Sequence, residues 1–355
     1  MIDFFHIRFI ISRIFANFAY MKHVKVDSSI DIFHRRLPFF LALEEWVARR
    51  LPAGDYFFSW QVDPTVICGR NQEIDKEVNL DYCAREGIDV VRRRSGGGAV
   101  FADRQNFMFS FITPSDRVTE TFAAYTAMIA EQLRRLNLDA EATGRNDITV
   151  AGKKISGNAF YHLPGRSIAH GTMLYDFDAT RLAGALTPSK AKLESKGVKS
   201  VPARVTCLKL EGIALSPEEF EQFIIDGITD GEPYILSASD VREVEQIELT
   251  YYDPSFMRIV NNRSASSQTH RRSIQRHIDG VGEICLEYDD LDSVIANCHI
   301  SGDFFMTDDA ATFAASLNGL DISDPHLEEK LLSLHPESFI HGLTAPLLLT
   351  LIRPS

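Results

Sequence analysis

The chain has 355 residues, 45% of them hydrophobic and 24% charged, which is an ordinary balance for a soluble globular protein. This length can bury a large core and favours two domains. The formal net charge of -12 argues against a protein that coats nucleic acid, because phosphate binding requires a basic surface.

Charge is spread unevenly along the chain. Residues 145–209 contain eleven lysines or arginines and four acidic residues, whereas residues 279–330 contain thirteen acidic residues and one base. The basic middle therefore favours an acidic small molecule or an acidic protein as partner. The five cysteines are widely spaced and include no CxxC pair, which indicates neither a zinc site nor a disulfide framework and favours a reducing cytoplasm.

The first twenty residues are apolar, but one aspartate, one histidine and two arginines interrupt them. No uninterrupted apolar span is long enough for a membrane helix, so we expect no stable membrane insertion. We interpret residues 1–30 as an N-terminal extension, with Met21 as an alternative start.

A helix is predicted over residues 37–51, where apolar residues recur at helical spacing and Pro38 lies in the first turn. Glu44 and Glu45 are assigned to its solvated face. Two strands follow, at residues 56–60 and 65–68. Trp60 ends the first strand and is a candidate to line an apolar pocket, although an aromatic residue at a strand end is more often part of the core.

The stretch VVRRRSGGGAVFADRQNFMFS, from Val90 to Ser110, places a glycine-rich loop between strand-like runs. Three consecutive glycines suit a backbone that adopts unusual angles or is approached closely by a ligand. Amide groups in such a loop, with guanidinium groups beside them, form an anion cradle. An ordinary glycine-rich turn is the alternative, and the flanking cations and strands make it the lesser one.

The middle of the chain predicts a long amphipathic helix over residues 119–138 and a hairpin with arms at 148–150 and 153–155. Gly157 is expected to interrupt the second arm. Another strand is predicted over 167–174, followed by a lysine-rich mobile loop at 191–205.

The rest of the chain predicts a helix from the capping box at Ser216 to about residue 228, and then a polar linker over residues 256–275. Beyond the linker, strands at 282–288 and 294–300 and a helix capped by Thr307 predict a small α+β domain over residues 276–355. Two further short helices would complete it.

Five motifs in order resemble the lipoate-protein ligase A family of the biotin/lipoate ligase fold. They are RRRSGGGAVF from Arg92, GRND from Gly144, KISGNA from Lys154, HGTML from His170 and SKGVKSVPARVT from Ser195. The resemblance implies an α+β protein, with a mixed β-sheet catalytic domain over residues 31–255 and a small C-terminal α+β accessory domain. The GDFF sequence from Gly302 lies where the family's accessory domain would place it.

The resemblance implies an ATP-dependent enzyme that converts lipoate to lipoyl-AMP and transfers the lipoyl group to a carrier lysine. Lys154 would be the catalytic residue, bridging the lipoate carboxylate and the α-phosphate, because two anions brought together need positive charge. A solvated hairpin lysine is the alternative for Lys154. Arg93 would contact lipoyl-AMP, unless it forms a surface salt bridge.

The other residues implied to bind the substrate or nucleotide come from three of these motifs and from Trp60. Asp147 would also hold Mg²⁺, although Asn146 and Asp147 equally suit a turn, and His170 is assigned only a pocket-lining role. The set comprises Trp60, Ser95, Gly96, Gly97, Gly98, Ala99, Val100, Phe101, Asn146, Asp147, His170, Gly171 and Thr172.

The implied partners are lipoate or octanoate and the acidic lipoyl carrier domains of 2-oxoacid dehydrogenase complexes or the glycine cleavage H protein. Ala102 departs from the family pattern, because many members have histidine at this position. An octanoyl or lipoyl transferase of the same fold, acting without ATP through a cysteine, remains an alternative. So do a biotin ligase, whose usual glycine motif differs, and a non-catalytic lipoate-binding protein.

Overall fold

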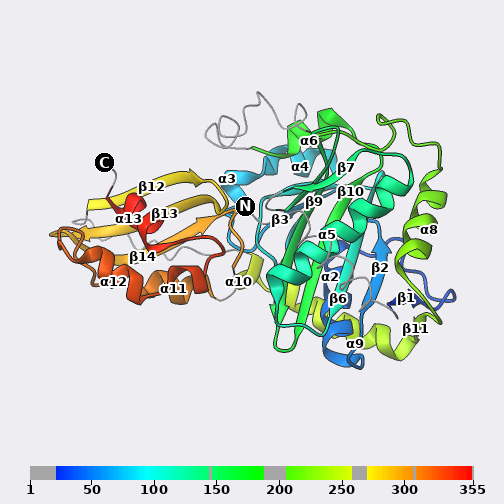
Figure 1. Ribbon diagram of the computed structural model, residues 1–355, viewed down its shortest axis with the longest axis horizontal. Coiled ribbons are helices and arrows are strands. Elements are labelled where there is room, and N and C mark those ends of the chain that lie inside the picture. Colours follow the sequence, from blue (N-terminus) through cyan, green and yellow to red (C-terminus); the bar gives the residue numbers. More distant parts are fainter. Residues whose placement is uncertain (1–20, 144–145, 188–204, 258–269, 307–308, 354–355) are drawn as a thin grey trace, which may run out of the picture.

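The computed structural model describes residues 21–143, 146–187, 205–257, 270–306 and 309–353. Figure 1 shows a larger unit that contains most of the chain and a smaller C-terminal unit beside it. In the described residues, no helix is both long and apolar enough to cross a membrane.

An eight-stranded mixed sheet forms the centre of the larger unit. Strand β1 pairs in parallel with both β11 and β2, whereas the remaining neighbours pair antiparallel. The strand order is β11 (Tyr234–Leu236), β1 (Lys22–Val26), β2 (Tyr56–Trp60), β6 (Asn106–Thr113), β10 (Arg166–Leu174), β9 (Lys153–Leu163), β8 (Asp147–Val150) and β7 (Ala140–Thr143).

Helices cover both faces of this sheet. Alternate residues of a strand point to opposite faces, so Phe58 and Ile112 pack in the same core as helix α2 (Leu37–Arg50), while Phe57 and Phe111 pack in the core that contains α5 (Val118–Arg135) and α8 (Pro217–Ile228). All eight residues of β6 are buried. Helix α9 (Ala238–Glu248) packs on α2 and is followed by η2 (Leu249–Tyr252) and α10 (Pro254–Met257).

A second, three-stranded sheet carries the glycine-rich stretch. Strand β3 (Thr65–Cys68) lies between β4 (Asp89–Arg92), which is parallel to it, and β5 (Val100–Ala102), which is antiparallel. The glycines therefore form a bend between β4 and β5. Short helices α3 (Ile74–Glu77), α4 (Leu80–Glu86) and α6 (Ala179–Ala185) complete the larger unit.

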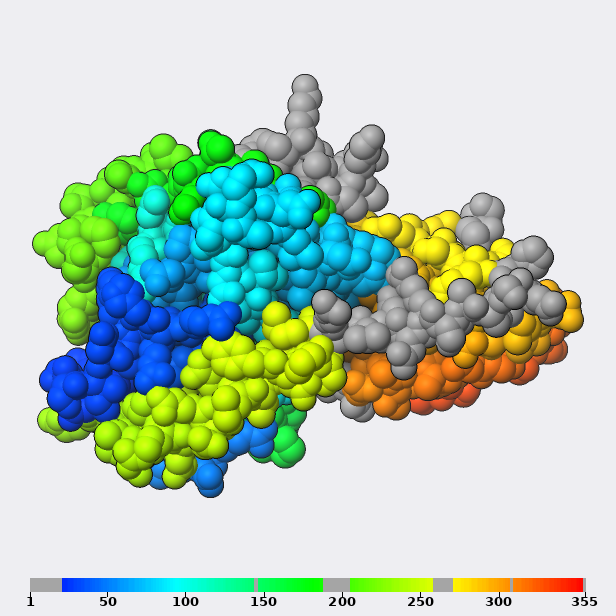
Figure 2. Space-filling model, turned by 180° about the vertical axis from the view of Figure 1, so that it is seen from behind, coloured from blue at the N-terminus to red at the C-terminus, as the bar shows by residue number. Residues whose placement is uncertain are grey.

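The C-terminal unit has its own sheet and core. Strand β13 (Gly282–Leu291) pairs antiparallel with β12 (His270–Ile278) and with β14 (Val294–Gly302). The helical segments that follow in sequence are α11 (Ala310–Ser316), α12 (Leu327–Ser333), η3 (Pro336–Ser338) and α13 (Ala345–Ile352). Seen from behind, this unit projects from one end of the larger unit (Figure 2).

The predicted fold class, a mixed-sheet unit with a small C-terminal α+β unit, is confirmed. Most of the predicted elements occur, but two of the predicted boundaries are wrong. Residues 22–26, assigned to an extension, form β1 inside the large sheet. Residues 270–275, assigned to the linker, belong to β12, where exposed arginines pair with acidic residues of β13 instead of indicating a loop.

Three details of the sequence interpretation also change. Gly157 does not interrupt the second hairpin arm, because β9 continues through it to Leu163. Helix α5 ends at Arg135 rather than at 138, since Asn137 has a positive φ of 60°. Thr307, most of the lysine-rich loop, most of the linker and residues 1–20 lie outside the described residues, and the cap of α11 is Asp309.

Candidate active site

A cavity of about 200 Å³ lies between the large sheet and the small sheet. Strands β2, β6, β8, β9 and β10 supply lining residues from the large sheet. The glycine-rich bend, β3 and β5 supply the opposite wall. Lys154 and Gly97, which are 57 positions apart in the sequence, therefore face a common space.

One part of the cavity is apolar. Its lining includes Leu41 from α2, Trp60 from β2, Ile67 from β3 and Met108 from β6, which share one hydrophobic core cluster. The Trp60 ring stacks on Phe40, with centroids 5.0 Å apart and planes 5° apart. A flat aromatic wall beside aliphatic side chains suits an apolar chain better than a polar ligand.

Lys154 is the ammonium group of the cavity wall. Its Nζ lies 2.7 Å from Asp147 Oδ1, and the two side chains are 20% and 10% exposed. The Lys154 side chain passes over Gly157, where an added Cβ would lie 2.6 Å from Nζ. The glycine thus leaves room for the lysine to reach the cavity.

Amide and hydroxyl groups surround Lys154 on the large sheet. Asn146 Nδ2 donates to the carbonyl of Asn158 at 2.9 Å, and Asn158 Nδ2 donates to the carbonyl of Asn146 at 3.0 Å. Thr172 Oγ1 lies 3.3 Å from both the amide nitrogen and the carbonyl oxygen of Gly157. These contacts hold the polar wall in place.

The glycine bend is packed directly against the C-terminal unit. The amide of Gly97, at a φ of 88°, donates to the carbonyl of Phe304 at 3.2 Å. A Cβ on Gly96 would lie 2.3 Å from that same carbonyl oxygen. The Phe305 ring stacks on Phe160 of β9 with centroids 5.1 Å apart. The bend is therefore closed on its outer side by the GDFF segment.

The three arginines that precede the bend mainly bind protein groups instead of forming the expected open cradle. Arg92 donates to the carbonyls of residues 69, 70 and 72. Arg93 donates to Ser95 Oγ and to the carbonyls of Ile67, Gly96 and Gly98, and burial lowers its pKa to about 10. Arg93 is only 5% exposed, so a surface salt bridge is wrong for this residue. Since carbonyl oxygens accept strong charge-assisted hydrogen bonds, these cations rigidify the loop.

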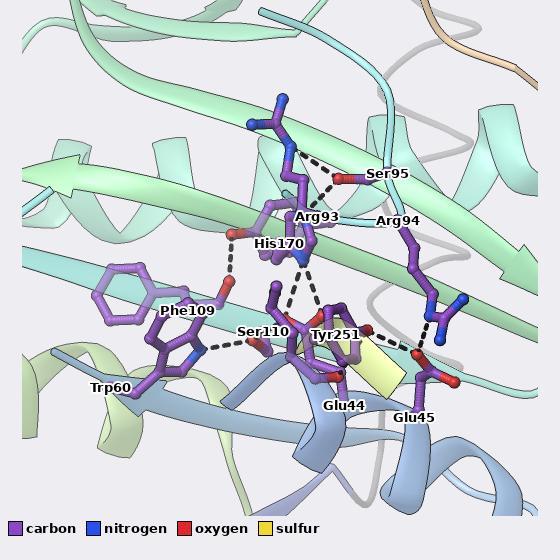
Figure 3. A network of polar contacts seen from close by, with 12 residues as sticks. Glu44, Glu45, Trp60, Arg93, Arg94, Ser95, Phe109, Ser110, His170 and Tyr251 are labelled. Carbon is purple, nitrogen blue, oxygen red and sulfur yellow. Dashed lines mark hydrogen bonds and ion pairs between the residues drawn. The ribbon is translucent and has the colours of Figure 1, made fainter. Parts of the chain in front are cut away.

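Helix α2 supplies carboxylates that the sequence interpretation placed in solvent, and that assignment is wrong. Glu44 is fully buried and lies 2.9 Å from His170 Nδ1, whereas Glu45, 3% exposed, accepts from Arg94 Nε at 2.5 Å (Figure 3). The surrounding PFFLALEEWVA contains no other polar side chain. A helical stretch whose other positions are all apolar is buried all round, so its glutamates must be paired. This signal could have revealed them.

Most of the predicted site residues lie around the cavity. Its wall contains Trp60, Arg93, Gly97, Gly98, Ala99, Val100, Phe101, Asn146, Asp147, Lys154, His170, Gly171 and Thr172. Ser95 and Gly96 lie behind that wall, Ser95 bound to Arg93 and His170, and Gly96 against Phe304. Sequence reasoning did not select Glu77, Asn158 or Asp303, which also line the cavity. Asp303 belongs to the GDFF sequence, so the position of that sequence in the accessory domain was the one feature that pointed to this residue.

The wall also allows a test of magnesium binding. In the portion of the chain that the structure describes, no group of three or more His, Cys, Asp or Glu side chains could hold a metal ion. The cavity carboxylates are Glu77, Asp147 and Asp303. Magnesium is commonly held by one or two carboxylates together with substrate phosphates. The residues therefore fit an ion carried mainly by a nucleotide, with Asp147 as a candidate protein ligand.

The sequence matches two known families. The lipoyl protein ligase A/B catalytic domain matches residues 38–229, and the bacterial lipoate protein ligase C-terminus matches residues 267–352. Lipoate–protein ligase 1 of Staphylococcus aureus is 35% identical to the chain over 297 residues, which are 82% of this chain and 89% of that protein.

Solved structures show the same fold. LipL1 of P. falciparum in complex with lipoate has a TM-score of 0.67 at 21% identity and covers 91% of this chain and 95% of its own. A lipoate-protein ligase A bound with ATP has a TM-score of 0.57 at 24% identity and covers 67% of this chain and 98% of its own. At these identities the likeness concerns the fold alone.

Proposed function

The chain belongs to the lipoyl protein ligase A/B family, and from that premise we propose that it activates lipoate with ATP and transfers the lipoyl group to a carrier lysine. One observation carries the proposal. A single cavity holds an apolar slot beside Trp60, an ammonium group at Lys154 and the backbone of the glycine bend. An amphiphilic acid and a nucleotide phosphate need these three features together.

The first half reaction joins two anions. A lipoate carboxylate oxygen attacks the α-phosphorus of ATP, the bond from that phosphorus to the β-phosphate oxygen breaks, and pyrophosphate leaves. Lys154 Nζ would neutralise the carboxylate and the α-phosphate, with Gly97 and Gly98 opposite it in the wall. Magnesium, when bound with the nucleotide, would neutralise charge on the phosphates.

The second half reaction transfers the acyl group. The carrier lysine amine attacks the carbonyl carbon of lipoyl-AMP, AMP leaves, and the amine loses a proton as the amide forms. Lys154 would again stabilise negative charge on the α-phosphate as AMP departs. Asn146, Asp147 and Thr172 would position the nucleotide from the large sheet, and Trp60 would hold the acyl chain.

The roles of the bend residues follow from where they lie. Val100 and Phe101 would form a wall for lipoyl-AMP, with Ala99, His170 and Gly171 lining the same space. Arg93 would act mainly by fixing the bend, because four of its contacts are to protein oxygens. Its predicted contact with lipoyl-AMP stays a prediction. Ser95 and Gly96 would support the bend from behind.

The carrier would be an acidic lipoyl domain of a 2-oxoacid dehydrogenase complex or the glycine cleavage H protein. The excess of basic residues between positions 145 and 209 supports an acidic partner. The five free cysteines agree with a reducing compartment such as the cytoplasm.

A transferase that uses cysteine without ATP is the second candidate, and the thiols disfavour it. All five cysteines lie in the described residues, and none of them lines the cavity. Burial raises the pKa of Cys68 to about 12 and also raises that of Cys207. A thiol with a raised pKa forms little of the thiolate that attacks an acyl group.

The test is exchange of labelled pyrophosphate into ATP by the purified protein with lipoate and magnesium. Lys154→Ala should lower the exchange rate on the order of 10²–10³-fold, the loss typical of one charge-stabilising group. Lys153→Ala is the matched control, since Lys153 is exposed and outside the cavity wall. A normal rate for Lys154→Ala, or exchange with biotin and not with lipoate, would defeat the proposal.

A second assay separates ligase from transferase. A lipoyl domain is incubated either with free lipoate and ATP or with an octanoyl carrier, and its mass is then measured. The ligase reaction predicts a mass gain only with the free acid and ATP. A gain from the octanoyl carrier without ATP would favour the transferase.

A further inference from the structure

Six buried side chains form one continuous chain of hydrogen bonds behind the cavity wall (Figure 3). Each of them is at most 5% exposed. On one side, Trp60 Nε1 lies 2.8 Å from Ser110 Oγ, and Ser110 Oγ lies 2.5 Å from Glu44 Oε1. Glu44 Oε2 lies 2.9 Å from His170 Nδ1. On the other side, His170 Nε2 lies 2.8 Å from Ser95 Oγ, which in turn lies 2.9 Å from Arg93 Nε. Glu44, Ser110 and Ser95 are not part of the cavity lining.

Donor and acceptor chemistry fixes the direction of the two end bonds of this chain. An indole N–H and a guanidinium N–H can only donate. Ser110 Oγ therefore accepts from Trp60, and its single proton is available for Glu44. Ser95 Oγ accepts from Arg93 in the same way, so its proton is available for His170 Nε2. A nitrogen that accepts this proton carries none of its own.

The tautomer of His170 depends on where the Ser95 proton goes. With Nε2 accepting, the imidazole proton lies on Nδ1, which faces the Glu44 carboxylate. The carboxylate is the one member that can only accept. Both arms of the chain thus end on Glu44, one from Trp60 at the apolar slot and the other from Arg93 at the glycine bend.

We propose that Glu44 is a positioning residue that holds His170 as the neutral Nδ1–H tautomer and fixes Trp60 and the glycine bend relative to each other. The inference rests on the proposed function, because it assigns this role at the same cavity. It also explains how an acid would be oriented. With His170 neutral and the Arg93 hydrogen bonds directed to protein oxygens, Lys154 is, among the described residues of the cavity wall, the cation left to attract a carboxylate.

The decisive measurement is the nitrogen-15 spectrum of His170 in the full-length protein without ligand, assigned with a His170→Gln variant. We expect a protonated Nδ1 and a bare Nε2 in the wild type at neutral pH. A protonated Nε2 there, in either the neutral or the charged ring, would overturn the proposal. This result is independent of whether the protein ligates lipoate, which the pyrophosphate exchange of the wild type decides.

Glu44→Gln tests the role of the carboxylate with almost no change in shape. Glu44 Oε1 and Oε2 lie 3.0 and 2.9 Å from Nδ1, so glutamine would place an NH2 donor as well as an oxygen beside the Nδ1 proton. The Nε2–H tautomer should therefore gain population, and the Ser95 proton should lose part of its acceptor. We expect kcat/KM for lipoate to fall on the order of 10²-fold, as misplacement by about 1 Å can do. An unchanged tautomer with an unchanged kcat/KM would refute the proposal.

Glu45→Gln is the matched control. It makes the same chemical change at the next helix position and is equally buried, but its carboxylate binds Arg94 and Tyr251 instead of His170. The His170 tautomer should stay that of the wild type in this variant. A tautomer shift in Glu45→Gln would show a general response to a buried amide and would contradict the assignment to Glu44. If Glu44→Gln does not fold, the wild-type spectrum alone still decides the tautomer.

Discussion

Replacing Gly96 by alanine should separate the glycine bend from the C-terminal unit. The new methyl group would lie 2.3 Å from the Phe304 carbonyl oxygen and 3.0 Å from the Phe305 Cα. Both are main-chain atoms, so no side-chain rotation relieves the clash. The oxygen must move by at least 0.7 Å to reach the 3.0 Å below which real Cβ contacts are essentially never found.

The cost can be worked from the contacts at this position. Inserting a methyl group into a packed site costs about 1–3 kcal/mol. The hydrogen bond from the Gly97 amide to Phe304, already 3.2 Å long, would be lost, at about 1 kcal/mol. We therefore expect the free energy of unfolding to fall by about 2–4 kcal/mol. Exchange activity should fall as well, because Gly97 and Gly98 line the cavity.

Urea unfolding and pyrophosphate exchange would measure both effects, with Gly54→Ala as the control. A Cβ on Gly54 would have its nearest neighbour at an ordinary 3.6 Å. Both replacements remove about the same backbone freedom from the unfolded chain, so this contribution cancels between them. If Gly96→Ala were as stable and as active as Gly54→Ala, the close approach between the bend and residues 304–305 would be refuted.

Two further perturbations concern stability. Burial, aided by Lys25, lowers the pKa of His23 to about 4, below the value of 6.5 of an unperturbed histidine. The unfolded chain therefore takes up the proton first, and the free energy of unfolding should fall as the pH drops from about 6.5 toward 4. This fall should be smaller in His23→Gln, and the same pH dependence of the urea midpoint in the two proteins would contradict the reasoning. Phe305→Ala should lower the free energy of unfolding by about 3–5 kcal/mol, because the ring is 1% exposed and stacks on Phe160; a loss below about 1 kcal/mol in urea unfolding would show that the ring is not packed there.

Local patterns predicted many elements of this fold well. The helical spacing after Pro38, the alternation around Ala151 and the capping box at Ser216 each correspond to an observed element. These signals are local because they depend on neighbouring residues in the chain. Strand β1 was missed although its residues alternate, because its partners β2 and β11 lie about 30 and 210 positions further along the sequence.

The candidate site was predicted less evenly. Motif order selected Lys154 and the glycines, and these residues do face one cavity. Motif order could not show that Arg93 binds carbonyl oxygens or that Gly96 contacts Phe304, because both contacts join distant parts of the backbone. Glu44 was misjudged since charge is normally a surface signal. Only the tertiary structure brings His170 to it across 126 positions.

Helix α2 illustrates a consequence of its two neighbouring carboxylates. Twelve of its fourteen residues are buried, so hydrophobic packing alone would differ little in free energy between one rotation about the helix axis and another. Glu44 finds its partners toward β6 and β10, while Glu45 finds them toward η2 and Arg94. Only one angular setting satisfies both, and any other would strand a charge in the interior at a cost of several kcal/mol. The two buried carboxylates thus fix the rotation of helix α2 about its own axis.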